Sequence, residues 1–270
     1  MWPVKILVFL VIAYLMVAGA LFALQTSLLF PVRMVGPAGP LPRGLERLEI
    51  AAAGGERLHG IHIAPAAASG APRPVLLGFA GNAWNAKNAA AFLHELFPER
   101  DVVAFHYRGY APSGGSPGAA ALLEDAPLVH DAVASRFGGR PIVAVGFSIG
   151  SGVAAHLAAR RPLAGAVLVT PFDSLGALAQ GQYPWLPVRL LLRHRMEPAR
   201  DLAGSAVPVA IIAGARDTLI PPPRTEALRQ AVPNLVYHRS IEGAGHNDIY
   251  QHSAFARAMG EALARIETGR

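Results

Sequence analysis

The pattern that most limits how this 270-residue chain can fold is the alternation of short apolar runs with longer helix-like stretches. Strand-like runs are expected at 48–52, 58–63, 75–79, 102–107, 142–147, 166–170, 209–213 and 236–241. From the third run onward, helical patterns fall between or after the strands, at 87–97, 119–137, 149–160, 224–231 and 249–266. Apolar strands alternating with helices form a parallel sheet covered on both faces, and the two leading strands add an antiparallel start. We therefore predict an α/β fold with a mostly parallel eight-stranded sheet and helices on both faces.

The N-terminal segment is apolar enough to be read as a membrane anchor. Residues 6–24 carry no charge, and about 20 apolar residues cross a bilayer as a helix. We predict a single-pass transmembrane helix over 6–24 within an anchor of residues 1–30. The alternative is a signal peptide cleaved near Ala20, which would release a secreted protein. Apolar sequence continues past Ala20 and favours the anchor, while the flanking charges leave the side of the membrane open.

Two further segments interrupt the pattern. Residues 31–44 are rich in proline and glycine and are expected to form a linker, so that the folded domain covers 45–270. Residues 175–206 are long for a strand-to-helix connection and contain aromatic, apolar and basic side chains. We predict a small helical cap there, over the functional site.

Composition excludes several classes of function. Hydrophobic residues make up 52% of the chain and charged residues 16%, which supplies a sizeable core and argues against disorder. Cysteine is absent, so a disulfide framework, a thiolate zinc site and a cysteine nucleophile are excluded. The net charge of +6 comes from scattered arginines rather than a basic stripe with interleaved aromatics, and no nucleic-acid partner is predicted. No metal or organic cofactor is implied.

Ser148 stands in a pattern that can expose a nucleophile. Gly-Phe-Ser-Ile-Gly at 146–150 fits G-x-S-x-G and lies between a predicted strand and a predicted helix. A sharp strand-to-helix turn there presents the serine hydroxyl, and flanking glycines avoid clashes between close backbone segments. The simpler alternative is a polar residue at the start of a helix. The setting between strand and helix favours the nucleophile.

A serine hydroxyl needs a base, and the base needs an acid to orient it. His246 lies in a glycine-rich loop after the last strand, where it can reach across the sheet edge. Asp217 follows the seventh strand, which yields the chain order Ser, Asp, His. Asp173, after the sixth strand, is an alternative acid, although it is also suited to start a helix as a cap. Asp248 is expected to cap the final helix.

Catalysis at a carbonyl also needs donors for the oxyanion. One is predicted to be the backbone N–H of Ile149, which follows the nucleophile, and the other the N–H of Asn82, in the loop after the third strand. Large side chains near the predicted site and in the cap are candidates for substrate contact: Trp84, Tyr110, Phe147, Trp185 and Leu186.

Seven stretches together resemble a known family. They are FAGNAWN at 79–85, YRGYAPSGGSP at 107–117, GFSIGSG at 146–152, TPFDSL at 170–175, YPWLPVRLLL at 183–192, GARDTLIP at 214–221 and GAGHND at 243–248. The set resembles the α/β-hydrolase superfamily and, within it, the membrane-anchored BEM46-like group related to the ABHD13 and ABHD17 proteins. The first stretch departs from that group, because Ala80 stands where histidine is usual and Trp84 replaces a glycine.

The residues and the resemblance lead to one expected function. We predict a membrane-tethered serine hydrolase that cleaves ester or thioester bonds of acyl substrates through an acyl-enzyme. Its expected partners are small-molecule or lipid-like acyl substrates and, through the N-terminal helix, membrane lipids. Two alternatives remain: a serine peptidase of the same fold, and a non-enzymatic membrane protein on a degenerate hydrolase scaffold, suggested by Ala80 and Trp84.

Overall fold

The computed structural model describes residues 2–42, 44–66 and 73–269. Within them, eight strands form a single sheet in the order β1-β2-β4-β3-β5-β6-β7-β8. The strands are β1 (Glu46–Ala51), β2 (Arg57–Ile63), β3 (Val75–Phe79), β4 (Val102–Phe105), β5 (Ile142–Phe147), β6 (Gly165–Val169), β7 (Val209–Gly214) and β8 (Leu235–Ile241).

Strand direction follows the predicted plan. β2 runs antiparallel to both β1 and β4, and every neighbouring pair from β4 to β8 is parallel. The prediction of a mostly parallel eight-stranded sheet with an antiparallel start is confirmed. Parallel strands end at the same edge of the sheet, so the loops after β3, β5, β6, β7 and β8 open onto one side, where a ligand of an α/β sheet binds.

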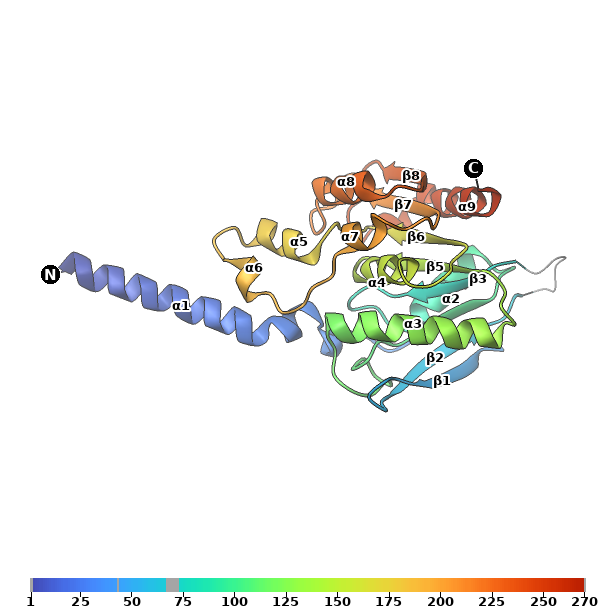
Figure 1. The fold of residues 1–270 in the computed structure, drawn as a ribbon, viewed down its shortest axis with the longest axis horizontal. Coiled ribbons are helices and arrows are strands. Elements are labelled where there is room, and N and C mark those ends of the chain that lie inside the picture. The colour runs from blue at the N-terminus through green and yellow to red at the C-terminus, as the bar shows by residue number, and fades with distance from the viewer. Residues whose placement is uncertain (1, 43, 67–72, 270) are drawn as a thin grey trace.

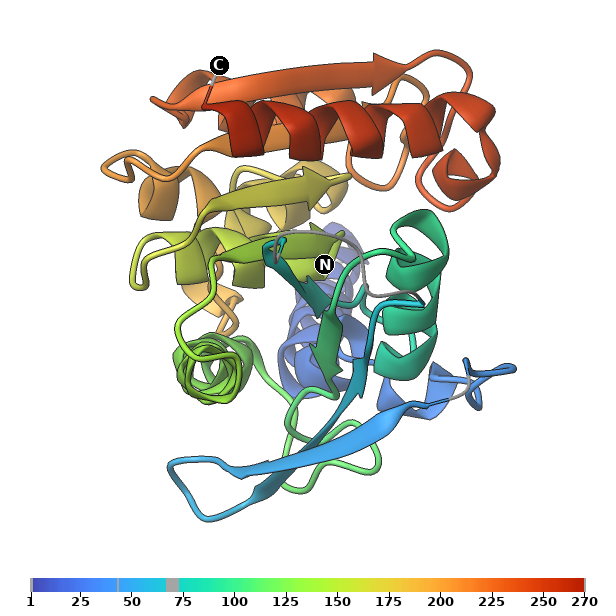
Figure 2. The ribbon, with the colours of Figure 1, turned by 90° about the vertical axis from the view of Figure 1, so that its right-hand side faces the viewer.

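Helices cover both faces of the sheet (Figure 2). α2 and α9 pack on one face, against β2 to β4 and β6 to β8 respectively, while α4 and α8 pack on the other, where α3 lies against α4. Their bounds are α2 (Ala86–Leu96), α3 (Ala119–Arg136), α4 (Ile149–Ala158), α8 (Pro222–Ala231) and α9 (Ser253–Thr268). The pattern predicted as one helix over 249–266 is in fact a 3₁₀ turn, η2 (Ile249–Gln251), followed by α9, because His252 between them has extended backbone angles.

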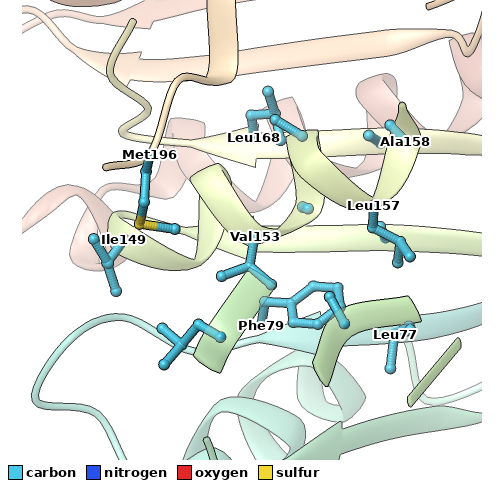
Figure 3. Packing of buried hydrophobic residues seen from close by; sticks show 14 of the residues in the cluster. Leu77, Phe79, Ile149, Val153, Leu157, Ala158, Leu168 and Met196 are labelled. Carbon is cyan, nitrogen blue, oxygen red and sulfur yellow. The ribbon is translucent and has the colours of Figure 1, made fainter. Parts of the chain in front are cut away.

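The core lies where the central strands meet these helices. β3, β4, β5, β6 and β7 are buried along their whole length, as expected for strands covered on both faces. Figure 3 shows Phe79, Val153, Leu157 and Leu168 packed together between the sheet and α4. Each such side chain contributes about 1.5–3 kcal/mol through burial. The strand and helix that carry Ser148 therefore stand on a rigid base.

The N-terminal helix α1 (Trp2–Leu29) is 28 residues long and extends beyond the predicted span of 6–24 at both ends. By length and composition it can cross a membrane. Figure 1 shows it projecting from the body of the molecule. The predicted linker contains a short 3₁₀ helix, η1 (Val32–Met34), and then runs along α2, where Gly39 N–H donates to Asn88 Oδ1 at 2.8 Å. The linker is thus held against the body.

The predicted cap segment, 175–206, has two structural parts. α5 (Leu175–Gln182) and α6 (Val188–Leu191) lie beside the C-terminal half of α1 (Figure 1). α7 (Pro198–Leu202) instead packs on α4 and α8, as the crossover helix between β6 and β7. From here on, "cap" means residues 175–195, which include α5 and α6 but not α7.

Candidate active site

Ser148 occupies a sharp turn between β5 and α4. Its backbone has φ 51° and ψ −118°, a conformation that costs free energy for a residue with a side chain. Glycines on both sides make the turn possible. A Cβ on Gly146 would lie 2.3 Å from the carbonyl oxygen of Gly150, and a Cβ on Gly150 would lie 2.2 Å from that of Phe79. The G-x-S-x-G pattern is therefore required sterically, and its result is a serine raised at the edge of the sheet.

The structure brings Ser148, His246 and Asp217 together from three strand ends. His246 Nε2 lies 2.9 Å from Ser148 Oγ, and His246 Nδ1 lies 2.7 Å from Asp217 Oδ2. Asp217 is 4% exposed, and its other oxygen, Oδ1, accepts hydrogen bonds from the N–H groups of Leu219 at 2.9 Å and Ile220 at 2.7 Å. These two bonds fix the carboxylate. Oδ2 is left facing the imidazole, so the chain of contacts suits proton transfer from the serine to the histidine.

The other two acids named from the sequence have different surroundings. Asp173 accepts a hydrogen bond at Oδ2 from Arg224 Nη1 at 3.1 Å, and the helix that follows is capped by Ser174 rather than by Asp173. Asp248 accepts from Gly245 N–H at 2.6 Å and makes no capping bond to a helix. Both capping predictions are wrong, because each carboxylate is engaged elsewhere. Asp248 instead braces the loop that carries His246.

The two predicted oxyanion donors lie beside Ser148. Ile149 is the first residue of α4, where backbone N–H groups have no partner within the helix. The Asn82 side chain donates from Nδ2 to Leu29 O at 2.6 Å and accepts at Oδ1 from the Tyr110 hydroxyl at 2.9 Å. Within the residues that the structure describes, the Asn82 N–H has no internal acceptor. Asn82, Ser148 and Ile149 all line the same cavity, so both N–H groups are available to a ligand oxygen.

That cavity has a volume of about 320 Å³ and is mainly apolar. Its walls come from three parts of the chain. The body contributes Asn82, Ser148, Ile149, Phe172, Leu219 and Ile220; the cap contributes Leu175, Leu178, Ala179, Gln182, Tyr183, Leu186, Val188, Leu191 and Leu192; and α1 contributes Leu21, Phe22, Gln25, Leu28 and Leu29. A mainly apolar cavity with Ser148 in its wall suits a ligand with an apolar part and one reactive group.

Of the five predicted substrate contacts, Leu186 lines the cavity and the other four do not. Trp84 and Phe147 pack with Phe92 and Tyr250, with ring centroids 5.1 to 6.2 Å apart, in the core cluster formed with α2 and α9. That packing turns the rings of Trp84 and Phe147 away from the cavity. The replacement of a glycine by Trp84 therefore extends a core cluster and does not narrow the cavity.

The remaining two predicted contacts have supporting positions. Tyr110 holds the Asn82 side chain, and burial raises the pKa of its hydroxyl, which stays protonated as a donor at neutral pH. Trp185 lies outside the cavity, with its ring centroid 6.1 Å from that of Tyr14 on α1.

Burial likewise raises the pKa of the Tyr250 hydroxyl to about 12. In the described ranges, no group of His, Cys, Asp or Glu side chains is arranged to hold a metal ion.

Sequence reasoning missed the residues of α1 that line the cavity. In the sequence, Gln25 is the one residue that indicated a contact between α1 and the rest of the protein. It is a polar residue at the end of an apolar stretch, and in the structure it is buried. A buried amide needs hydrogen-bond partners, so its position pointed to a contact with protein.

Comparison with known proteins agrees with this fold. A family model described as the alpha/beta hydrolase fold matches residues 75–190. An uncharacterized protein of Mycobacterium tuberculosis is 34% identical over 205 residues, which cover 74% of this chain and 72% of the relative. The chain belongs to the α/β-hydrolase superfamily. Human alpha/beta hydrolase domain-containing protein 17C is a more distant relative, 28% identical over 167 residues, which cover 61% of this chain and 49% of that protein.

Solved structures show the same fold at low identity. An esterase of Pyrococcus furiosus superposes with a TM-score of 0.67 at 18% identity, over 86% of this α/β-hydrolase and 97% of the esterase. A bacterial membrane phospholipase A superposes with a TM-score of 0.61 at 16% identity, over 98% of each chain. At these identities the solved structures support the fold alone, whereas membership of the α/β-hydrolase superfamily supports a hydrolase.

Proposed function

We propose that this α/β-hydrolase is a membrane-tethered serine hydrolase that cleaves ester or thioester bonds of acyl substrates. The observation that carries the proposal is the hydrogen-bonded series from Ser148 Oγ through His246 to Asp217, whose serine lines an apolar cavity. The two nearby N–H groups, of Asn82 and Ile149, support it. These are the parts that acyl transfer by a serine requires.

In the proposed reaction, Ser148 Oγ attacks the acyl carbonyl carbon while its proton passes to His246 Nε2. The carbonyl oxygen becomes an oxyanion and accepts the N–H groups of Asn82 and Ile149. The tetrahedral intermediate then collapses, and His246 gives the proton to the departing alcohol or thiol. A water molecule next loses a proton to His246 and attacks the acyl-enzyme. The carboxylic acid leaves, and Ser148 regains its proton.

The cavity walls and α1 indicate the class of substrate. The walls offer leucine, isoleucine and phenylalanine side chains, which favour an aliphatic chain over a charged or peptide-like group. The 28-residue apolar helix supports attachment to a membrane, where acylated molecules are concentrated. The alcohol or thiol that leaves would extend away from the apolar walls.

The test is a hydrolysis profile of detergent-solubilised full chain on p-nitrophenyl esters and acyl thioesters of graded length. We expect turnover that rises from short to medium chains as the cavity fills, and none above background for Ser148→Ala. A Ser151→Ala variant is the matched control, because Ser151 is a buried helix residue whose hydroxyl donates to Ser148 O rather than facing the cavity. Equal turnover by Ser148→Ala, or cleavage of peptide but not acyl substrates, would contradict the proposal.

A further inference from the structure

Helix α1 and the cap are joined by a buried polar contact. Gln25 donates from Nε2 to Leu191 O at 3.1 Å and accepts at Oε1 from the Arg193 N–H at 2.8 Å. Around it, Leu186 and Val188 of the cap bury Ala18 of α1. Because the amide has partners on the cap through both its donor and its acceptor, α1 and the cap form one packed unit. The cap must therefore lie wherever α1 lies.

The contact extends far along α1. The Tyr14 hydroxyl donates to Trp185 O at 3.2 Å, halfway along the helix. The part of α1 ahead of Tyr14, residues 2–13, is about 18 Å long at about 1.5 Å per residue. A hydrocarbon core is about 30 Å thick. If α1 crosses the membrane from its N-terminal end, residues 2–13 span about 18 Å of the hydrocarbon core. The remaining distance of about 12 Å must be spanned by the part of the helix that the cap contacts.

The outer surface of the cap is suited to lipid. Tyr183, Trp185 and Leu190 are exposed, and Leu190 is 84% exposed. Residues 174–196 contain no acidic side chain, and Arg189 and Arg193 of the cap are exposed. Apolar side chains bounded by arginines match a bilayer, whose apolar interior lies beneath often anionic headgroups.

Arg193 marks the depth at which that surface would end. Its guanidinium lies 4.8 Å from the centroid of the Phe22 ring, and its Nη2 donates to Phe22 O at 3.2 Å. Long basic side chains extend to the headgroup region from such positions. The headgroup level is then near Phe22, about 30 Å along the helix from Trp2 at about 1.5 Å per residue. The cavity lies next to that level, since Phe22 is one of its walls.

We propose that the cap is embedded in the same membrane as α1, so that acyl chains enter the cavity directly from the lipid. Five residues both line the cavity and are exposed, and so form its rim: Phe22, Leu28, Gln182, Tyr183 and Leu219. The rim is apolar apart from the Tyr183 hydroxyl and the Gln182 amide, which donates to Leu219 O. An acyl chain can pass over this rim from a leaflet without crossing water. Its cleavage rests on the proposed function, whereas the position of the cap does not.

The first test measures depth and needs no catalysis. Three full-length variants each keep one of the three tryptophans, Trp2, Trp84 or Trp185, with phenylalanine at the other two positions. Each is reconstituted in phosphatidylcholine vesicles and in vesicles whose acyl chains carry bromine, a quencher that acts only at short range. We expect brominated lipid to remove most of the emission of Trp2 and Trp185. Trp84, packed in the cluster with Phe92, keeps its emission and is the internal control.

Quenching of Trp2 without quenching of Trp185 would overturn the proposal and leave a simple tether. Quenching of neither residue would overturn it as well, together with the anchor. Failure of the proposed function is seen separately, as a well-folded protein that shows these quenching results and has no Ser148-dependent turnover.

The second test compares two substrates with charged variants. Leu190→Asp places a charge on the outer cap, and Ala256→Asp places the same charge on an exposed position of α9, which lies far from α1 in Figure 1. The quantity measured is turnover of a long-chain ester in vesicles divided by turnover of a short soluble ester. We expect Leu190→Asp to lower this ratio by about tenfold, because an acidic side chain resists insertion into a bilayer. An unchanged ratio, or an equal fall in Ala256→Asp, would contradict an embedded cap.

Discussion

Asp217→Asn is the substitution whose effect follows most directly from the geometry. The two carboxylate oxygens of Asp217 have separate partners. Oδ1 accepts the N–H groups of Leu219 and Ile220, and Oδ2 faces His246 Nδ1. An asparagine of the same shape keeps its oxygen on the two backbone donors, because turning the amide would set its NH₂ group against them. Its NH₂ group therefore faces His246.

This arrangement changes the tautomer of the histidine. An NH₂ group opposite Nδ1 requires a lone pair on Nδ1, which moves the ring proton to Nε2. Nε2 lies 2.9 Å from Ser148 Oγ and can then no longer accept the serine proton. The same change in a serine protease with this triad lowers kcat by about 10⁴-fold. That factor equals about 5.5 kcal/mol of transition-state stabilisation, at about 1.4 kcal/mol for each tenfold.

The assay is ester turnover by the detergent-solubilised full chain, with thermal unfolding as a check on folding. Asp173→Asn is the matched control, because Asp173 is paired with Arg224 and does not touch His246. We expect about a 10⁴-fold loss for Asp217→Asn and a loss of less than tenfold for Asp173→Asn. Near wild-type turnover by Asp217→Asn, with the loss in Asp173→Asn instead, would refute the assignment of the acid.

Three further predictions concern stability, each measured by unfolding in detergent. Gly150→Ala should destabilise the fold by about 3 kcal/mol or more, since the new Cβ would lie 2.2 Å from a carbonyl oxygen. Gly260→Ala is the control: Gly260 has open space around it, so this change should be neutral or stabilising by up to about 1 kcal/mol. Equal effects of the two substitutions would contradict the steric argument. Asp125→Asn should cost about 1–3 kcal/mol, because it removes the buried carboxylate charge from the partly buried guanidinium of Arg108, which keeps Glu124 at 3.8 Å as a weaker partner. A cost below about 0.5 kcal/mol would show that the pair is dispensable. Burial lowers the pKa of His106 from 6.5 to about 4, so between these pH values the unfolded chain binds a proton at His106 that the folded chain does not. The free energy of unfolding should therefore fall by up to about 3 kcal/mol as the pH drops from 6.5 to 4. His106→Asn should flatten this pH dependence, and an unchanged slope would show that other groups cause it.

The fold and the candidate cluster of Ser148, His246 and Asp217 were accessible from sequence because both depend on periodicity along the chain. Strands at 75–79 and 142–147 were placed with their observed bounds, since their apolar runs end at turn residues. Once the sheet is parallel, loops after its strands meet at one edge. Ser148 and His246, 98 positions apart, could therefore be paired before any coordinates.

Side-chain direction and the contacts of α1 were not accessible in the same way. Phe147 is the last residue of β5 and Ser148 lies in the turn that follows, so the two side chains part, and the Phe147 ring enters the core with Trp84 rather than the cavity. A helix that is apolar on all sides has the same sequence pattern whether lipid or protein surrounds it, so the pattern does not reveal which residues contact protein. The contact of Gln25 with Leu191 joins residues 166 positions apart and has no periodic signal. The cavity walls supplied by α1 thus emerged only from the structure.

Covalent labelling by a fluorophosphonate tests the central claim, that Ser148 is an activated nucleophile, most directly. The reagent forms a stable bond with a serine whose hydroxyl is activated by a base, and mass spectrometry of the digested full chain locates the adduct. We predict one adduct, on the peptide that contains Ser148, with labelling abolished in Ser148→Ala and strongly slowed in His246→Ala. A well-folded wild-type chain that takes no label, or a Ser148→Ala chain that labels as fast as wild type, would contradict the account.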